Sequence, residues 1–168
     1  MTVRRCVLTA ALLAAPGFAA GQEPTGCSVF KWPIERERAA LAASTKPVVV
    51  NGGALRYGAG QTLALAPFAE AGLPHAPERA PKVTPSFAGH FTLGAPGKPG
   101  LYKVTLASEG WIDLIDKGAF LHPKGFSGAP GCEGARKSVE FELPGRPLDV
   151  QLSNVRDAEI GVIVTPFE

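Results

Sequence analysis

Short alternating apolar segments, separated by glycine and proline, constrain the fold of this chain more than any other feature. Apolar residues occupy every second position in segments 101–106, 138–143, 148–152 and 160–164, which is typical of strands with one buried face. The 20 glycines and 16 prolines interrupt these segments, as turn residues do. Roughly eight or nine short strands at this spacing predict a mainly β, antiparallel β-sandwich or jelly-roll-like domain.

Two local patterns add a helix and a hairpin to this architecture. Residues 28–43 predict one short N-terminal helix, with Pro33 in the first turn, where a missing N–H costs nothing. Segments 111–115 and 119–121 predict a β-hairpin around a tight reversal at residues 116–118.

Two segments predict loops: a long surface loop at residues 67–85, and an ordered or tethered loop at residues 122–135. Residues 67–85 contain five prolines, and residues 122–135 contain four glycines and two prolines. Neither segment has the period of a helix or of a strand, so we expect both to connect helices or strands without forming any themselves.

The first residues have the three-part pattern of a secretory signal. Arg4 and Arg5 give a positive start, an apolar run extends to about residue 15, and small residues follow. The apolar run is shorter than the roughly 20 residues that span a bilayer. We therefore predict a signal peptide at residues 1–20, one domain over residues 21–168, and a periplasmic or secreted protein. The arginine pair leaves Sec and Tat export both open.

The charge of the chain argues against two classes of partner. The formal net charge is +2, and removal of Arg4 and Arg5 with the signal would leave 15 basic against 15 acidic residues. A neutral domain without a basic run lacks the electrostatic footprint for nucleic acid or for an anionic membrane surface. A second apolar stretch of membrane length is also lacking in the sequence, so we expect no membrane insertion.

Loss of the signal would remove Cys6 and leave Cys27 and Cys132. Two lone cysteines in an exported domain predict one disulfide. The alternatives are a metal thiolate pair, which lacks companion ligands nearby, and a catalytic thiol, which lacks a Cys–His context. On the chain-entropy model, a bridge across a loop of about 105 residues removes about 4–5 kcal/mol from the advantage of the unfolded state.

Patterns for catalysis are weak throughout the sequence. His75, His90 and His122 each stand alone, without the spacing of metal ligands, so we predict no metal and no cofactor. Ser127 lies in a glycine-containing loop that does not have the Gly-x-Ser-x-Gly spacing of a nucleophile elbow. Asp113 is better explained as a solvent-facing strand residue than as half of a carboxylate pair.

Aromatic side chains are the remaining candidates for ligand contact. Aromatic rings can stack on sugars or apolar ligands, although core packing explains most of them in a domain of this size. Trp111 is our first candidate for a ligand-binding residue and Tyr102 is the second.

Two resemblances accompany these observations. The first rests on Gly100-Leu101-Tyr102-Lys103-Val104, Trp111-Ile112-Asp113 and Lys137-Ser138-Val139-Glu140-Phe141. With these residues, the last 70 or so positions loosely resemble the pre-peptidase C-terminal-like β-sandwich of exported bacterial proteins. The second rests on Cys27-Ser28-Val29-Phe30-Lys31-Trp32 with Arg36-Glu37, and on Cys132 with Arg136-Lys137-Ser138-Val139. With these, the whole chain resembles a group of small exported proteobacterial proteins, some of which carry a homogentisate dioxygenase label. Neither resemblance implies catalytic residues.

We therefore expect an exported, non-catalytic β-sandwich that acts as a binding or accessory module. Its partner would be a small molecule, a glycan or an envelope protein. The alternatives are a small metal-dependent enzyme, which the dioxygenase label suggests, and a purely structural envelope protein.

Overall fold

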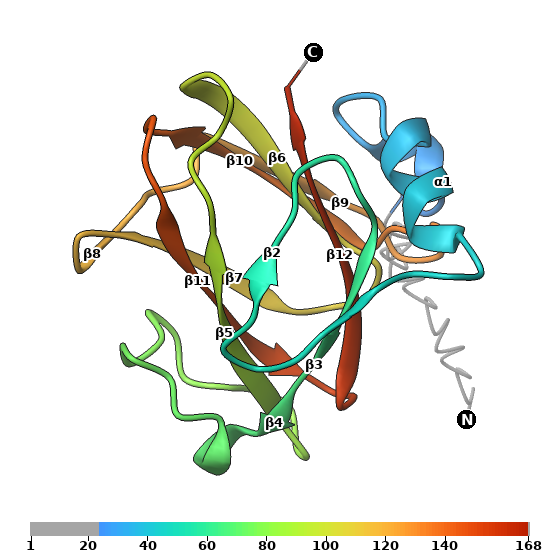
Figure 1. Cartoon of the computed structure of the whole chain (residues 1–168). Coiled ribbons are helices and arrows are strands. Elements are labelled where there is room, and N and C mark those ends of the chain that lie inside the picture. The colour runs from blue at the N-terminus through green and yellow to red at the C-terminus, as the bar shows by residue number, and fades with distance from the viewer. Residues whose placement is uncertain (1–23, 168) are drawn as a thin grey trace, which may run out of the picture.

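The computed structural model describes residues 24–167, so the predicted signal peptide at residues 1–20 lies outside the described residues. The described chain is mainly β, as predicted, and forms a sandwich of two sheets rather than a closed barrel (Figure 1). Sheet A contains, in spatial order, β1 (Val48–Val49), β3 (Gln61–Ala64), β12 (Glu159–Pro166), β6 (Gly100–Leu106), β10 (Lys137–Leu143) and β9 (Gly125–Gly128).

Sheet B faces sheet A across the core. It contains, in spatial order, β2 (Ala54–Leu55), β5 (Phe87–Leu93), β11 (Leu148–Val155), β7 (Trp111–Asp116) and β8 (Ala119–Phe120), and β4 (Ala66–Pro67) also pairs with β5. Both sheets are mixed, because β1 runs parallel to β3 and β2 runs parallel to β5. The long strands pair antiparallel, as the sequence predicts.

Alternation along each strand separates the core from a second buried surface. In β6, the side chains of Tyr102, Val104 and Leu106 belong to the apolar core between the sheets. Lys103 and Thr105 point to the opposite face, because successive side chains of a strand alternate, and yet they are also buried. Sheet A is therefore covered on both faces.

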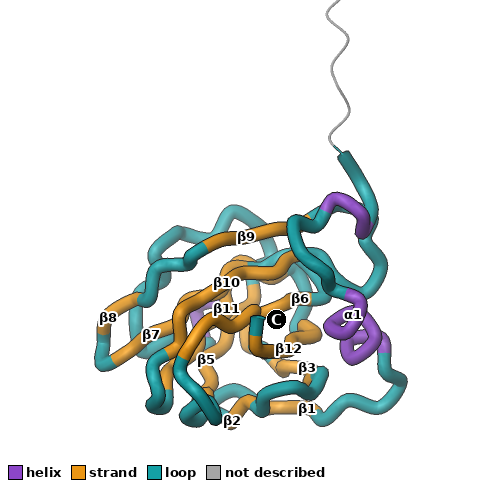
Figure 2. Tube along the Cα trace, turned by 90° about the horizontal axis from the view of Figure 1, so that it is seen from above, coloured by secondary structure: helices purple, strands orange, loops and turns teal. Residues whose placement is uncertain are grey.

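The covering element is the N-terminal segment, residues 24–43, which packs outside sheet A (Figure 2). It contains the 3₁₀ turn η1 (Cys27–Val29) and the helix α1 (Glu35–Ala42). The predicted helix at 28–43 is thus shorter than expected, and Pro33 precedes it instead of lying in its first turn. Proline disfavours the helical conformation in the residue before it, which prevents η1 and α1 from joining. Among residues 24–167, no helix is long and apolar enough to cross a membrane.

A buried ion pair attaches α1 to sheet A. The Nζ of Lys103 lies 3.0 Å from Oε1 of Glu37, whose side chain is 2 % exposed. Thr165 donates a hydrogen bond to the same oxygen (2.6 Å), and Lys103 also donates to the carbonyl of Pro33 (3.2 Å). Burial alone would raise the pKa of Glu37, but the hydrogen bonds from Thr165 and Lys103 outweigh it, so the pKa lies below its ordinary value.

A second polar contact lies nearby on the same face. The indole N–H of Trp32 donates to Oγ of Ser138 (3.1 Å), and Oγ1 of Thr105 lies 3.0 Å from that oxygen. Ser138 and Thr105 are fully buried. This face of sheet A is therefore polar, and its groups are satisfied by one another and by the N-terminal segment, as buried polar groups require.

The predicted disulfide attaches the start of the N-terminal segment to the rest of the domain. Cys27 and Cys132 are bonded, at a sequence separation of 105 residues. Around the bridge, Ile34, Ala129 and Ala135 form a small second apolar cluster that is separate from the main core. The start of the described chain is thereby pinned to the connection between β9 and β10.

Replacing Lys103 with methionine is expected to lower the free energy of unfolding by about 3–5 kcal/mol at neutral pH, because it leaves the Glu37 carboxylate buried without its partner. At pH values above the ordinary glutamate pKa, the lowered pKa of Glu37 stabilises the wild-type fold. This stabilisation is lost as the pH falls through the pKa that Glu37 has in the folded protein. The deficit of the variant should therefore shrink in acid. Urea unfolding at several pH values measures the difference in free energy of unfolding between the variant and the wild type, with the exposed Lys124→Met as control. A difference that stays constant with pH would contradict the role of the buried ion pair.

The double variant Cys27→Ala, Cys132→Ala is expected to lose about 2–5 kcal/mol of stability, because the unfolded chain is no longer closed into a long loop. Urea unfolding of the oxidised wild type, the reduced wild type and the variant tests this. Reduction of the wild type should reproduce the effect of the substitutions. Equal unfolding midpoints for all three would show that the bridge does not constrain the chain.

Candidate functional site

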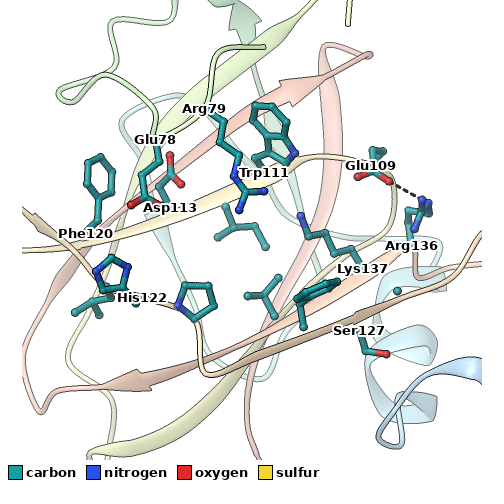
Figure 3. A pocket seen from close by; sticks show the side chains of 16 residues that line it. Glu78, Arg79, Glu109, Trp111, Asp113, Phe120, His122, Ser127, Arg136 and Lys137 are labelled. Carbon is teal, nitrogen blue, oxygen red and sulfur yellow. Dashed lines mark ion pairs between the residues drawn. The ribbon is translucent and has the colours of Figure 1, made fainter. Parts of the chain in front are cut away.

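A cleft of about 500 Å³ lies between β7 of sheet B and strands β9 and β10 of sheet A (Figure 3). Residues 120–123, which connect the two sheets, line one end of it, and Glu78 and Arg79 reach it from the loop over sheet B. The cleft thus lies where strands of different sheets meet, and several separate chain segments contribute to it.

A tight turn fixes the geometry of the β7–β8 hairpin. Lys117 and Gly118 have φ angles of 51° and 82°, and Asp116 pairs with Ala119 on either side of them. Two successive positive φ angles characterise the type I′ turn, whose twist matches that of the flanking strands. The predicted reversal at residues 116–118 is confirmed.

The hairpin is short, and it leaves the first part of β7 unpaired on the cleft side. The last bond between its arms runs from the N–H of Leu121 to the carbonyl of Leu114 (2.7 Å). The same register, continued, would set Pro123 opposite Ile112. Proline has no N–H to donate, so the pairing stops and the edge of β7 at Ile112 remains open toward the cleft.

The opposite wall comes from β9, which the sequence analysis missed. Segment 122–135, predicted as a loop, contains this four-residue strand, paired antiparallel with β10. Glycine is required at Gly128, because a Cβ there would lie 2.8 Å from the carbonyl oxygen of Arg136. Between its glycines, β9 places Phe126 on the same face of sheet A as its partner Val139, where it lines the cleft and is 65 % exposed. Ser127 is buried on the opposite face and accepts a hydrogen bond from the N–H of Lys31 (2.9 Å).

The proline-rich segment 67–85 is a loop as predicted, apart from Pro67, which ends β4, and the 3₁₀ turn η2 (Phe68–Glu70). Buried amides hold it against sheet B. The side chain of Gln151 accepts from the N–H of His75 (2.9 Å) and donates to its carbonyl (3.1 Å). Asn154, at an irregularity in β11, accepts from the N–H groups of residues 82 and 83. These contacts position the loop over the outer face of sheet B.

Glu78 and Arg79 approach β7 from this loop, where Asp113 points toward them (Figure 3). Burial, and then the negative charge of Glu78, raise the pKa of Asp113. A hydrogen bond from the Glu78 backbone and the charge of Arg79 oppose this rise without cancelling it. Asp113, predicted as a solvent-facing strand residue, is instead half-buried at the cleft.

Two further charged groups line the far end of the cleft. Lys137 points into it, and its Nζ donates to the carbonyl of Gly110 (3.1 Å). Burial lowers the pKa of Lys137, the charge of Glu109 opposes this, and the charges of Arg79 and Arg136 reinforce it. Glu109 and Arg136 form their own ion pair (2.9 Å), partly exposed at the rim.

The structure places the two predicted ligand-binding residues at different sites. Trp111 lines the cleft, and the charged groups of Arg79 and Lys82 lie 5.7 and 6.0 Å from its ring centre. Tyr102 is buried in the core, where its ring contacts Tyr57 (5.4 Å between centres) and its hydroxyl donates to a backbone carbonyl at residue 98 (2.9 Å). It also lines a separate depression, together with Tyr57.

The histidines are distributed over several elements. His75 is in the loop over sheet B, His90 is on β5, and His122 lines the cleft beyond β8. Within residues 24–167, no group of three or more histidine, cysteine, aspartate or glutamate side chains is arranged to hold a metal ion.

Comparisons with family models, with curated proteins and with solved structures find no match to this chain. The two resemblances described above therefore remain predictions, and the function must be argued from the cleft itself.

The substitution Asp113→Asn is expected to stabilise the protein at neutral pH. Because the folded pKa of Asp113 is raised, its ionisation destabilises the fold progressively as the pH rises through the interval between the ordinary aspartate pKa of about 3.9 and the folded value. An asparagine cannot ionise and can still accept a hydrogen bond. Thermal unfolding should show a higher Tm for the variant at neutral pH and no difference below about pH 3.9. The exposed Asp149→Asn is the control, and a destabilised Asp113→Asn at neutral pH would contradict the prediction.

Proposed function

We propose that the protein is a non-catalytic binding module of the periplasm or the extracellular space, and that the cleft between β7 and β9 is its ligand site. The composition of the cleft carries the proposal. Phe126 is 65 % exposed on one wall and Trp111 is partly exposed on the other, with Ile112 and Val139 also lining the cavity. Small-ligand sites are usually cavities of about 300–1,000 Å³ in which polar groups orient the ligand. Here six charged residues line the cleft beside the apolar walls: Glu78, Arg79, Glu109, Asp113, Arg136 and Lys137.

The partners of the charged groups favour binding over catalysis. Glu109 is paired with Arg136, and Lys137 is held by a backbone carbonyl. Asp113 is held by the backbone of the loop above it. Groups with fixed partners orient a ligand well, whereas acid–base catalysis needs a group free to exchange its proton with substrate.

The exported location is supported by the disulfide between Cys27 and Cys132. Disulfides persist in oxidising compartments and are rare in the cytosol. The bridge therefore supports the same location as the signal pattern in the first 20 residues of the sequence.

The two tryptophans of the chain provide the test. A library of small aromatic carboxylates, aromatic amines and methyl glycosides is screened by NMR, with the two indole N–H signals as reporters. Ligands should shift the signal of Trp111 in the cleft and leave that of Trp32, which is bonded to Ser138, in place. Trp111→Ala should weaken binding at least tenfold, since it removes an aromatic wall, and Tyr102→Phe should not.

A library that shifts neither indole, or shifts only that of Trp32, would overturn the proposal. Binding that is lost in Tyr102→Phe and kept in Trp111→Ala would move the site to the depression near Tyr57.

A further inference from the structure

Resting on the proposed function, we propose that the cleft binds the C-terminal residue of an extended polypeptide. That residue pairs with the open edge of β7 at Ile112 and places its carboxylate against Lys137. Three features of the described residues carry this inference: the unpaired backbone of Ile112, the position of the Lys137 ammonium, and the apolar surface between them.

The backbone of Ile112 provides a place for one added residue. In an antiparallel ladder, every second residue directs both its N–H and its C=O to the same side. The carbonyls of Leu114 and Gly110 point to the cleft side, where they accept from Leu121 and Lys137. Ile112 lies midway between them and faces the same way. Within residues 24–167 we find no hydrogen-bond partner for its N–H or C=O on that side.

The ammonium of Lys137 determines which end of a chain fits. A peptide antiparallel to β7 would donate its N–H to the Ile112 carbonyl and accept from the Ile112 N–H on the side of Gly110. Lys137 is fixed on that side by its bond to Gly110 (3.1 Å). A terminal carboxylate would therefore meet the Ile112 N–H and the ammonium together, a charge-assisted arrangement. An amino terminus in the same place would be repelled.

The apolar lining receives the side chain of the bound residue. A residue directly opposite Ile112 presents its side chain on the same face of the sheet as Ile112, which is the face toward the main core. Val139, Leu121 and the exposed ring of Phe126 line the cleft together with Ile112. The preferred terminal residue is thus apolar or aromatic.

The open edge of β7 is too short for an internal segment of a polypeptide to bind to it as an added strand. On one side, the N–H of Leu121 already donates to the carbonyl of Leu114. On the other side, the Nζ of Lys137 donates to the carbonyl of Gly110. One residue fits between them, and the preceding residues must leave the cleft toward solvent past Pro123. An ordinary strand addition uses several consecutive pairs, whereas a chain terminus needs only this one.

The test uses the oxidised protein and a library of synthetic hexapeptides with randomised C-terminal residues, each prepared as free acid and as C-terminal amide. Peptides selected for binding should end in an apolar or aromatic residue, and the amides should bind at least tenfold more weakly. NMR should show slowed hydrogen exchange at the Ile112 amide. Lys137→Met should lose the preference for the acid, Lys137→Arg should retain it, and the exposed Lys124→Met serves as the matched control.

The outcomes separate this inference from the proposed function. Equal affinity for acids and amides at the cleft would overturn the recognition of a terminus and leave a binding site. Acetate or benzoate bound as tightly as the best peptide would overturn the polypeptide as ligand. A library that shifts none of the cleft amides would also overturn the inference, while the fragment screen on Trp111 decides the proposed function independently. The acid–amide comparison on the wild type needs no variant to fold.

Discussion

The buried ion pair between Glu37 and Lys103 ties the rest of the structure together. Charges removed from water cost several kcal/mol each unless their geometry is satisfied, so the N-terminal segment docks in one position on sheet A. In that position the N–H of Lys31 reaches Ser127, and the ammonium of Lys31 lies 5.3 Å from the ring centre of Phe126. The docked segment thereby positions β9, which is one wall of the cleft. An ion pair that does not itself line the cleft, together with the disulfide, thus contributes to the shape of the cleft.

Most of the fold follows from alternation, because a strand buried on one face repeats every second residue. β6, β7, β10, β11 and β12 all lie where that period predicts them. The sequence does not predict β9, because Gly125 and Gly128 leave no apolar period. Gly128 is required there by its close contact with the backbone carbonyl of Arg136. The polar outer face of sheet A could not be predicted either, since Lys103 in an alternating strand has the pattern of a solvent-exposed residue.

The site was less predictable than the fold, for a related reason. Trp111, predicted as an aromatic residue that could stack on a ligand, does line the cleft, but Tyr102 meets the same criterion and lies in the core. Composition does not distinguish a core aromatic residue from a cleft aromatic residue. Phe126 and Lys137 were not recognised, because their roles depend on β7 and β9 meeting across the two sheets. Pro123 was the one available signal: a proline just after a hairpin arm indicates where pairing stops.

The electrostatics of the cleft connect its folding to its proposed recognition. Burial lowers the pKa of Lys137, which means that the folded protein holds this cation in an environment that disfavours the charge. An ammonium has three donors, and the carbonyl of Gly110 takes one of them. The charges of Arg79 and Arg136 disfavour the cation further, whereas those of Glu109 and Asp113 favour it. A carboxylate bound at the Ile112 N–H would accept from the remaining donors of the ammonium, which is the charge-assisted contact that the proposed recognition requires.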